Sequence, residues 1–403
     1  MNILFISLGC DKNLVDTEVM LGMLASRGYQ MVEEETQADV IVINTCCFVH
    51  DAKEESIQNI LEMAEYKKSG TCKALIVTGC MAQRYKEEIT QEIPEVDAVL
   101  GTTSYGDIVK ALNEVQAGNV FQEFRDINEL PEDSGRRVLT TGGHYGYLKI
   151  AEGCDKHCTY CIIPSLRGRF RSVPQERLIA QAEHMAEQGV KELILVAQET
   201  TMYGTDLYGK KTLHLLMKEL CKIKGIRWIR VLYCYPEEIN DELIEAIKNE
   251  PKVCHYLDMP IQHCNKTILK RMNRHYRLAE YKELVRNLRK EIPGLALTTD
   301  LIVGFPGETE ENFRETLDTL QELQFSAIHV FPYSPRKGTP AAAYPNQVKP
   351  EIKKERAARV QALGKEMAGA YRKQFFHKIV RVLVEEEKEG FFEGVSDEYI
   401  RVF

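Results

Sequence analysis

The sequence has no long apolar run, no excess of positive charge and no basic leader at its start. No apolar stretch approaches the ~20 residues that a transmembrane helix needs, so we expect no membrane partner. The formal net charge is −8, so there is no global basic field for nucleic acid, and a basic protein is the more natural partner. The first apolar run, residues 3–8, is too short for a signal peptide and predicts a β-strand instead. These absences favour a cytoplasmic protein.

The composition is that of a globular protein. The chain has 403 residues, of which 44% are hydrophobic and 28% are charged, and its length predicts two or three domains. It also has 12 cysteines without an export signal. In a reducing compartment we expect such cysteines to be metal ligands or buried thiols rather than disulfides.

Three cysteines lie close together in the pattern C-x3-C-x2-C, namely Cys154, Cys158 and Cys161. Thiolates at this spacing can surround one soft-metal centre, and iron–sulfur clusters are held by such ligands. A fourth cysteine is missing nearby, and His157 is a poor substitute because its loop would have to turn it inward. The open position predicts an iron that binds a substrate, as a catalytic zinc does. A zinc site and a set of unrelated buried cysteines remain as alternatives.

The first 115 residues alternate between short apolar, β-rich runs and longer segments with helical spacing. The predicted strands are residues 2–8, 39–44, 74–78 and 96–100, and the clearest predicted helices are residues 14–27 and 52–66. Strand–helix repeats of this length predict a parallel, doubly wound sheet.

A cysteine follows each of the first three of these strands. Cys10, Cys46 and Cys80 are 36 and 34 residues apart, which is about one strand–helix unit each. Ligands of such sheets bind beyond the carboxyl ends of the strands, so three loops should deliver one thiolate each to a common crevice. The spacing therefore predicts a second three-cysteine site. The alternative is that each cysteine is a small core residue after a strand.

Four neighbouring residues have less certain roles. Cys47 adjoins Cys46 and could be the ligand instead, but adjacent residues near a strand end point to opposite sides, so we expect one of the two to face the crevice. Cys72 precedes its strand at the wrong end of the sheet, and we expect no functional role for it. Asn13 and Asp16 could orient the Cys10 loop, although a helix cap is the favoured interpretation.

The segment from 117 to 146 is polar and predicts a linker, with one short strand at residues 137–140. After it, strand-like runs occur at residues 147–151, 192–197, 228–233, 256–260, 296–303 and 327–332, separated by helical segments such as residues 174–188, 237–248, 278–291 and 310–323. This is a repeat count of about six β/α units, fewer than the eight of a closed barrel.

Polar residues gather where these strands end, and active groups of β/α barrels lie at such ends. They include Gln198 and Glu199. Arg167, Arg169 and Arg171 follow the cysteine triplet, and they either contact a substrate or form an exposed loop face. The remaining cysteines share no spacing, so we interpret them as core thiols: Cys221, Cys234, Cys254 and Cys264.

The last segment, residues 371–403, predicts strands at 379–385 and 399–403 that flank the sequence FFEG at residues 391–394. We interpret it as the start of a small β-barrel. About thirty residues cannot close such a barrel, so we expect the chain to be truncated here.

Around the cysteine triplet the sequence resembles the radical S-adenosylmethionine (SAM) enzymes, whose signature is C-x3-C-x-aromatic-C, with Tyr160 at the aromatic position. The resemblance implies an open, partial (β/α)6 barrel and a [4Fe–4S] cluster whose bare iron chelates the amino and carboxylate groups of SAM. One electron then cleaves SAM to methionine and a 5′-deoxyadenosyl radical. The same resemblance implies that Gln198 and Glu199 hold the methionine ammonium and that residues 302–304, ending in Gly304, pack against adenine.

The whole chain resembles the methylthiotransferases, which have an N-terminal cluster domain, a radical SAM domain and a C-terminal TRAM β-barrel. The resemblance implies an α/β fold with a cluster domain at residues 1–116, a linker at 117–146, a radical SAM domain at 147–370 and a partial TRAM-like domain at 371–403. It assigns Cys154, Cys158 and Cys161 to the SAM cluster. It assigns Cys10, Cys46 and Cys80 to a second, auxiliary [4Fe–4S] cluster, and so favours Cys46 over Cys47.

Within this family, three runs resemble the branch that modifies ribosomal protein S-twelve of the small subunit: residues 8–16, 161–168 and 196–209. The implied reaction inserts sulfur and a methyl group at the β-carbon of an aspartate. The implied partners are the ribosomal protein, a reductant protein such as flavodoxin or ferredoxin, and a sulfide or polysulfide donor. Modification of a tRNA adenosine, another radical SAM reaction with two clusters, and a non-enzymatic metal-binding scaffold remain as alternatives.

Overall fold

A computed structural model of the chain describes residues 1–70, 72–131 and 137–403. Over these residues the chain forms two compact units, each with pieces that are separate in sequence. The N-terminal unit comprises Met1–Thr140, Glu152–Asp155 and Ile162–Val173, and the C-terminal unit comprises Thr141–Ala151, Lys156–Cys161 and Pro174–Phe403. The domain bounds that the sequence suggests stay a prediction.

The N-terminal unit is built around a parallel sheet with the strand order β2-β1-β3-β4-β5-β6. The bounds are β1 Asn2–Ser7, β2 Gln30–Met31, β3 Val40–Thr45, β4 Ala74–Gly79, β5 Ala98–Leu100 and β6 Phe121–Glu123. Every residue of β3 and β4 is buried, as expected for central parallel strands with both faces covered.

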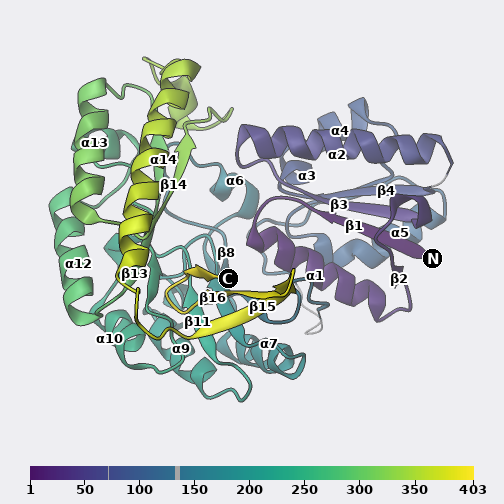
Figure 1. The fold of residues 1–403 in the computed structure, drawn as a ribbon. Coiled ribbons are helices and arrows are strands. Elements are labelled where there is room, and N and C mark those ends of the chain that lie inside the picture. The colour runs from purple at the N-terminus through teal and green to yellow at the C-terminus, as the bar shows by residue number, and fades with distance from the viewer. Residues whose placement is uncertain (71, 132–136) are drawn as a thin grey trace. The chain divides into compact units, whose positions relative to one another are not determined.

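Helices cover both faces of this sheet (Figure 1). Their bounds are α1 Asp11–Ala25, α2 His50–Lys68, α3 Cys80–Arg84, α4 Lys86–Glu92, α5 Ile108–Gln116 and α6 Ile163–Arg167, with short 3-10 turns η1 Glu35–Gln37 and η2 Tyr105–Asp107. Leu24 of α1 and Leu112 of α5 pack into one apolar cluster, whereas Ile60 of α2 packs into another. The predicted doubly wound sheet is therefore confirmed.

One expectation for the segment after α5 was wrong, and the structure adds a strand that was not expected. The segment predicted as a linker contributes β6, a strand of three residues that is too short to show a period in the sequence. Residues 137–140 form no strand. Their backbone bonds to α1 instead: the N–H of Val138 donates to the carbonyl of Glu18 (3.1 Å), and the N–H of Thr140 donates to Glu18 Oε1 (2.8 Å).

The C-terminal unit has parallel strands at each of the six predicted positions. They pair in the orders β11-β10-β7 and β12-β13-β14, and a parallel bridge joins Ile229 to Val253. The bounds are β7 Tyr145–Lys149, β10 Glu192–Val196, β11 Trp228–Val231, β12 Tyr256–Asp258, β13 Ala296–Val303 and β14 Ala327–Pro332. Between β7 and the cysteine loop lies β8 (Ala151–Glu152), and β9 (Arg171–Ser172) follows the loop.

Helices separate these strands, as expected for a β/α repeat. Their bounds are α7 Gln175–Glu187, α8 Thr205–Tyr208, α9 Leu213–Cys221, α10 Asp241–Asn249, α11 Lys266–Arg271, α12 Leu278–Glu291, α13 Glu310–Leu323 and α14 Pro350–Lys373, with 3-10 turns η3 Pro236–Glu238 and η4 Pro340–Ala343. The helix predicted from residue 237 begins later, because the side chain of Asn240 caps α10 by accepting from the N–H of Leu243. Among the described residues, no helix is both long and apolar enough to cross a membrane.

The end of the chain forms an antiparallel sheet of β15 (Val382–Lys388), β16 (Phe391–Ser396) and β17 (Arg401–Val402). The sequence suggested that FFEG lies between two strands. In the structure it lies within β16. A two-residue turn causes this: Glu389 and Gly390 both have positive φ (52° and 84°), which suits a tight hairpin between paired strands.

One buried arginine connects this antiparallel sheet to the barrel strands within the C-terminal unit. Arg230 of β11 is fully buried and pairs with Glu192 of β10 (Nε to Oε1, 2.6 Å). Its other nitrogens donate to the carbonyls of Asp397 (3.1 Å) and Ser396 (3.4 Å). Its guanidinium also lies 4.5 Å from the centre of the Tyr399 ring. The charge of Arg230 is thus satisfied partly by the strand beside it and partly by the C-terminal sheet.

Removing Arg230 should destabilise this unit more than removing the whole pair. In Arg230→Met the carboxylate of Glu192 stays buried without its partner, and we expect a loss of about 3–5 kcal/mol in the free energy of unfolding. The double variant Arg230→Met/Glu192→Leu should recover most of this loss. Urea unfolding can be followed by the fluorescence of Trp228, the single tryptophan of the chain. Equal losses in the two variants would contradict the prediction.

Candidate functional site

In the N-terminal unit, three cysteines follow adjacent strands whose carboxyl ends lie side by side in the sheet. The register pairs Ser7 of β1 with Asn44 of β3, and Thr45 of β3 with Gly79 of β4. Cys10 comes three residues after β1, Cys46 directly after β3, and Cys80 directly after β4. The parallel pairing therefore brings the three cysteine loops to one edge of the sheet.

Two glycines let these loops approach one another closely. A Cβ added to Gly9 would lie 2.6 Å from the Cβ of Cys46 and 2.9 Å from its sulfur. One added to Gly79 would lie 2.3 Å from Oδ1 of Asn44. Both glycines have φ near +90°, where other residues are strained. No larger residue would fit at either position without moving a cysteine loop.

Asn13 holds the Cys10 and Cys46 loops together from within α1. Its Nδ2 donates to the carbonyls of Leu8 and Thr45 (both 3.0 Å). The helix-cap interpretation of Asn13 and Asp16 was wrong, because α1 starts at Asp11 and Cys10 occupies the N-cap position. Asn13 instead orients the loops, which was the alternative.

Cys46 and Cys47 have different surroundings. Cys46 is the neighbour of Gly9, and its own N–H donates to the Ser56 hydroxyl (3.0 Å). Cys47 packs in the apolar cluster beneath the sheet, and its sulfur donates to the carbonyl of Cys80 (3.4 Å). Burial raises the pKa of the Cys46 thiol to about 11 and that of Cys47 to about 12. Cys46 is the one of the pair that faces the Cys10 loop.

Arg167 lies beside Cys80 and is neither an exposed loop residue nor free for a substrate, so both expectations for it were wrong. Its side chain is 2% exposed, and its Nη2 lies 3.5 Å from the sulfur of Cys80. Two buried carboxylates, Asp16 (2.8 Å) and Glu152 (3.2 Å), balance its charge. Arg169 is exposed, and Arg171 donates to the carbonyl of Arg167 (3.1 Å).

The donors at this three-cysteine edge are thiols, the ligand type that holds iron–sulfur clusters. In the described part of the chain, the sulfurs of Cys10, Cys46 and Cys80 are not all within 4.8 Å of one another. Ligands around one zinc would lie about 3.8 Å apart, given tetrahedral Zn–S bonds of about 2.3 Å. Thiolates that hold the irons of a larger cluster stand further apart. By type and number, these three thiols suit a four-iron cluster with one iron left open.

The cysteine triplet of the loop is divided between the two units. Cys154 belongs to the N-terminal unit, where its N–H donates to the carbonyl of Gly168 (3.1 Å). Cys158 and Cys161 belong to the C-terminal unit, where the N–H of Cys161 donates to the carbonyl of Cys158 (3.0 Å). Tyr160 between them is buried, and Nη1 of Arg336 donates to its carbonyl (2.6 Å).

Glu199 lies after β10 and has an oxygen that suits a cationic ligand. It is 1% exposed, and its Oε1 accepts hydrogen bonds from the N–H and hydroxyl of Thr201. Its buried Oε2 has no hydrogen-bond partner within the described residues. Burial raises the pKa of the Glu199 carboxyl to about 8, although the Thr201 hydrogen bond and the charge of Lys156 act to lower it. Gln198 beside it is half-buried. The ammonium of SAM would satisfy the orphaned oxygen.

Tyr160 and the end of β13 share one apolar cluster of the C-terminal unit. The cluster contains Cys158, Tyr160, Ile302, Phe305 and Tyr333. Gly304 starts the loop after β13, and its N–H donates to Oε2 of Glu308 (2.9 Å). The structure thus brings the aromatic residue of the cysteine loop together with the run expected to pack against adenine.

Arg274 is a residue of this unit that sequence reasoning missed. It is buried, its Nη1 lies 3.8 Å from the sulfur of Cys158, and its Nη2 donates to the carbonyl of Pro260 (3.0 Å). Its guanidinium also lies 4.2 Å from the centre of the Tyr235 ring. A lone arginine after a helix has no spacing that would have distinguished it from a surface residue.

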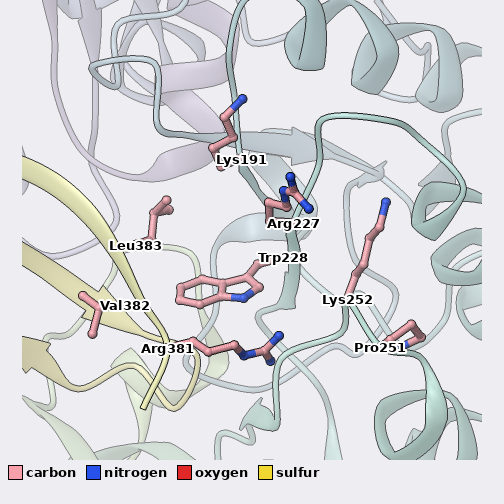
Figure 2. A pocket seen from close by; sticks show the side chains of 8 residues that line it. All are labelled: Lys191, Arg227, Trp228, Pro251, Lys252, Arg381, Val382 and Leu383. Atoms are coloured by element: carbon pink, nitrogen blue, oxygen red, sulfur yellow. The ribbon is translucent and has the colours of Figure 1, made fainter. Parts of the chain in front are cut away.

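A cavity of about 430 Å³ lies elsewhere in the C-terminal unit (Figure 2). Its lining includes Lys191, Arg227 and Trp228, which stand at the amino ends of β10 and β11. The residues expected to bind SAM follow the carboxyl ends of the same strands. Chemistry in β/α barrels takes place at the carboxyl ends, so this cavity is not the SAM site.

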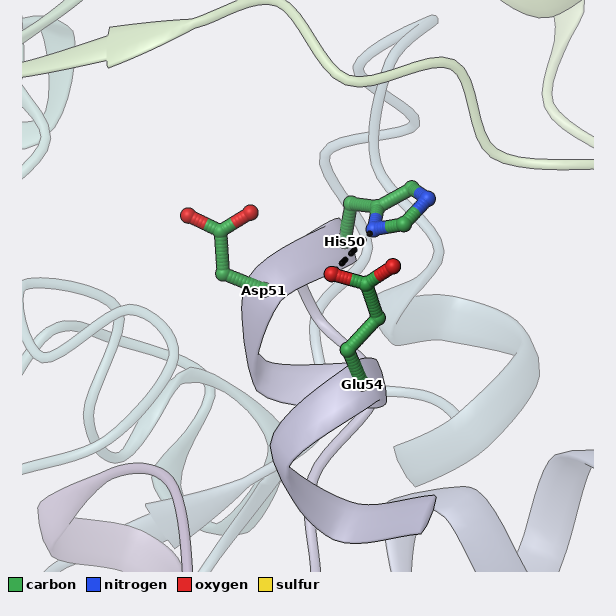
Figure 3. Close-up of side chains that lie close together, drawn as sticks. All are labelled: His50, Asp51 and Glu54. Carbon is green, nitrogen blue, oxygen red and sulfur yellow. Dashed lines mark ion pairs between the residues drawn. The ribbon is translucent and has the colours of Figure 1, made fainter. Parts of the chain in front are cut away.

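His50, Asp51 and Glu54 form an exposed group at the start of α2 (Figure 3). Nδ1 of His50 pairs with Glu54 at 3.3 Å, and this ion pair accounts for their proximity. All three side chains face solvent, and we assign no metal to them.

Comparison with known proteins agrees with this description. Residues 2–101 match the model of uncharacterized protein family UPF0004, and residues 148–320 match that of the radical SAM superfamily. A radical SAM methyltransferase, TsrM of Kitasatospora setae, is similar in fold, with a TM-score of 0.58 at 13% identity over 85% of this chain and 75% of that one. The α/β fold with a radical SAM domain is therefore confirmed.

Two relatives are named ribosomal protein uS12 methylthiotransferase RimO. That of Lachnoclostridium phytofermentans is 55% identical over 98% of this chain and 90% of its own length. That of Desulforamulus reducens is 45% identical over 97% of this chain and 89% of its own length. At this identity and coverage, the chain belongs to the family of the ribosomal protein uS12 methylthiotransferases.

Proposed function

We propose that this protein attaches a methylthio group to the β-carbon of an aspartate of ribosomal protein uS12. Family membership at 55% identity supports the substrate, and the two cysteine triplets support the chemistry. The observation that carries the proposal is the meeting of Cys10, Cys46 and Cys80 at one edge of the N-terminal sheet. This second triplet offers a place, apart from the cysteine loop of residues 154–161, that could hold the sulfur that is transferred.

The residues divide into two sets of ligands. We assign Cys154, Cys158 and Cys161 to the [4Fe–4S] cluster that binds SAM. We assign Cys10, Cys46 and Cys80 to the auxiliary [4Fe–4S] cluster. When bound, the clusters and SAM supply the one-electron chemistry, the sulfur and the methyl group.

The remaining side chains of the C-terminal unit bind and orient SAM. Glu199 accepts from the methionine ammonium through its orphaned Oε2, with Gln198 beside it. Tyr160 and Gly304 border the position of the adenine, where the apolar cluster around Phe305 excludes water. The hydrogen bonds of Thr201 keep the carboxylate of Glu199 turned toward the ligand.

The reaction requires further partners. Cleavage of SAM consumes an electron, which we assign to a reductant protein such as flavodoxin or ferredoxin. Renewal of the transferred sulfur requires a sulfide or polysulfide donor. Both the substrate protein and these donors suit a protein of the cytoplasm.

The substrate is tested by offering both candidate polymers together. The enzyme is reconstituted without oxygen and given SAM, reductant and sulfide with ribosomal protein uS12 and tRNA, and both digests are analysed by mass spectrometry. We expect the methylthio mark on an aspartate of uS12. A mark on a tRNA adenosine would contradict the proposed substrate, and deoxyadenosine formation with neither polymer marked would contradict the proposed reaction.

The adjacent cysteines Cys46 and Cys47 provide a matched test of the auxiliary cluster. Cys46→Ala should lose about half of the iron of the reconstituted protein and all methylthio transfer, while still cleaving SAM, because the other cluster is retained. Cys47→Ala should keep its full iron content, because its sulfur packs in the apolar cluster. Iron analysis and deoxyadenosine formation measure the two effects. The reverse pattern would assign Cys47 as the ligand.

Replacing Glu199 should raise the stability of the SAM-free protein and weaken its binding of SAM. The pKa of Glu199 is raised from 4.5 to about 8, so its charged form destabilises the SAM-free protein as pH rises through this range, with Lys156 and Glu237 as its charged neighbours. Glu199→Gln should therefore gain about 1–3 kcal/mol in stability at pH 8, shrinking toward pH 5. The same variant should bind SAM at least about tenfold more weakly. Thermal unfolding at both pH values and calorimetric titration with SAM measure this, and unchanged SAM affinity would contradict it.

A further inference from the structure

The N-terminal unit places Arg167 firmly against the auxiliary site. Arg167 ends α6, and Ile162 before this helix and Leu166 within it pack in the apolar cluster of the sheet. The hydroxyl of Thr102 donates to the carbonyl of Leu166 (2.6 Å), and Nη2 of Arg171 donates to the carbonyl of Arg167 (3.1 Å). The backbone that carries Arg167 is thus held on both sides of the residue.

The guanidinium divides its contacts between two kinds of acceptor. Nη1 faces the carboxylates, Asp16 Oδ2 at 2.8 Å and Glu152 Oε2 at 3.2 Å. Nη2 faces Oδ1 of Asn13 at 2.5 Å and the sulfur of Cys80 at 3.5 Å. The carboxylates neutralise the buried charge from one side, and the other side presents N–H groups to a cysteine that we assign to the auxiliary cluster.

A guanidinium in this position acts on a thiolate in a definite direction. It stays charged in a protein, and a hydrogen bond from a charged donor to sulfur is stronger than one between neutral groups. Hydrogen bonds to the cluster sulfurs and the local charge are among the features that set the reduction potential of an iron–sulfur cluster. Because reduction adds negative charge, a buried cation beside a ligand favours the reduced form.

We propose that Arg167 is a positioning residue that raises the reduction potential of the auxiliary cluster by donating a hydrogen bond from Nη2 to the thiolate of Cys80. Asp16 acts in the opposite direction and lowers the potential, because its negative charge partly cancels the positive charge of Arg167 at this site. This inference rests on the proposed auxiliary cluster at Cys10, Cys46 and Cys80. If Arg167 merely neutralises two buried carboxylates, the potential will not respond to it.

The two residues should move the potential in opposite directions. Asp16→Asn keeps a hydrogen-bonding side chain next to Nη1 and should raise the potential of the auxiliary cluster. Adding Arg167→Gln to this variant removes the donor after the charge of Asp16 has been removed, and Glu152, the other carboxylate at Nη1, is charged in both variants. Compared with Asp16→Asn, the double variant should have an equilibrium constant for one-electron reduction of the auxiliary cluster that is about tenfold smaller. This corresponds to a reduction potential about 59 mV lower. Arg169→Gln removes an exposed positive charge two residues after Arg167 and should leave the reduction potential of the auxiliary cluster unchanged.

The measurement is a redox titration of the full-length holoenzyme monitored by electron paramagnetic resonance. The cluster held by Cys154, Cys158 and Cys161 is recognised by its spectral change when SAM is added, and the auxiliary signal by its absence from Cys46→Ala. The expected result is an auxiliary potential that rises in Asp16→Asn and falls in the double variant, while that of the SAM-binding cluster stays constant.

Other results would each overturn one claim. A wild-type protein with no second signal would contradict the auxiliary cluster itself, and so the proposed function. Two signals whose potentials are the same in all variants would contradict the role of Arg167 alone. Loss of auxiliary iron in both Asp16 variants, with the fold retained by circular dichroism, would assign Arg167 to the architecture of the site and would also overturn the tuning role.

Discussion

The parallel register of β1, β3 and β4 is the constraint on which the N-terminal site depends. Because these neighbouring strands end level with one another, a residue placed just after each of them must come to the same edge. The same constraint excludes Cys72, which precedes β4 and lies at the opposite edge, although it is as buried as Cys46 and Cys80, whereas Cys10 is exposed. Position relative to the strand, and not burial, separates the cysteines that can act together from those that fill the core.

Buried charge distinguishes functional from structural positions in this protein. Arg230 and Glu192 satisfy each other, and the remaining donors of Arg230 reach backbone carbonyls, so nothing is left for a ligand. Glu199 is equally buried, yet one of its oxygens has no hydrogen-bond partner in the described chain. A buried carboxylate oxygen without a hydrogen-bond partner is costly, so we infer that Oε2 of Glu199 receives a cation from outside the chain. Arg167 stands between these cases, with paired carboxylates on one side and the sulfur of Cys80 on the other.

Periodicity in the sequence predicted the parallel sheet, the six strands of the C-terminal unit and the recurrence of cysteines after strands. These features repeat, so each occurrence strengthens the others. The errors concern features without repetition. A strand as short as β6 has no measurable period, and the hairpin at Glu389–Gly390 depends on backbone angles that composition does not reveal. Arg167 was misjudged because it alternates in sequence with two further arginines, Arg169 and Arg171, whereas its neighbours in space are Asp16, Glu152 and Cys80.

The N-terminal unit is discontinuous, and this affects how the protein can be made and how it can evolve. Its core includes Ile162 and Leu166, and the counter-charge of Asp16 comes from Arg167, all of which follow the cysteine triplet in the chain. During synthesis the sheet can form early, but its charge balance and part of its apolar cluster are completed after residue 173 has left the ribosome. For the same reason, exchanging residues 1–116 between related enzymes would separate Asp16 from its arginine. Residues 1–116 are therefore not a self-sufficient module, because the N-terminal unit is completed by chain that follows Cys161.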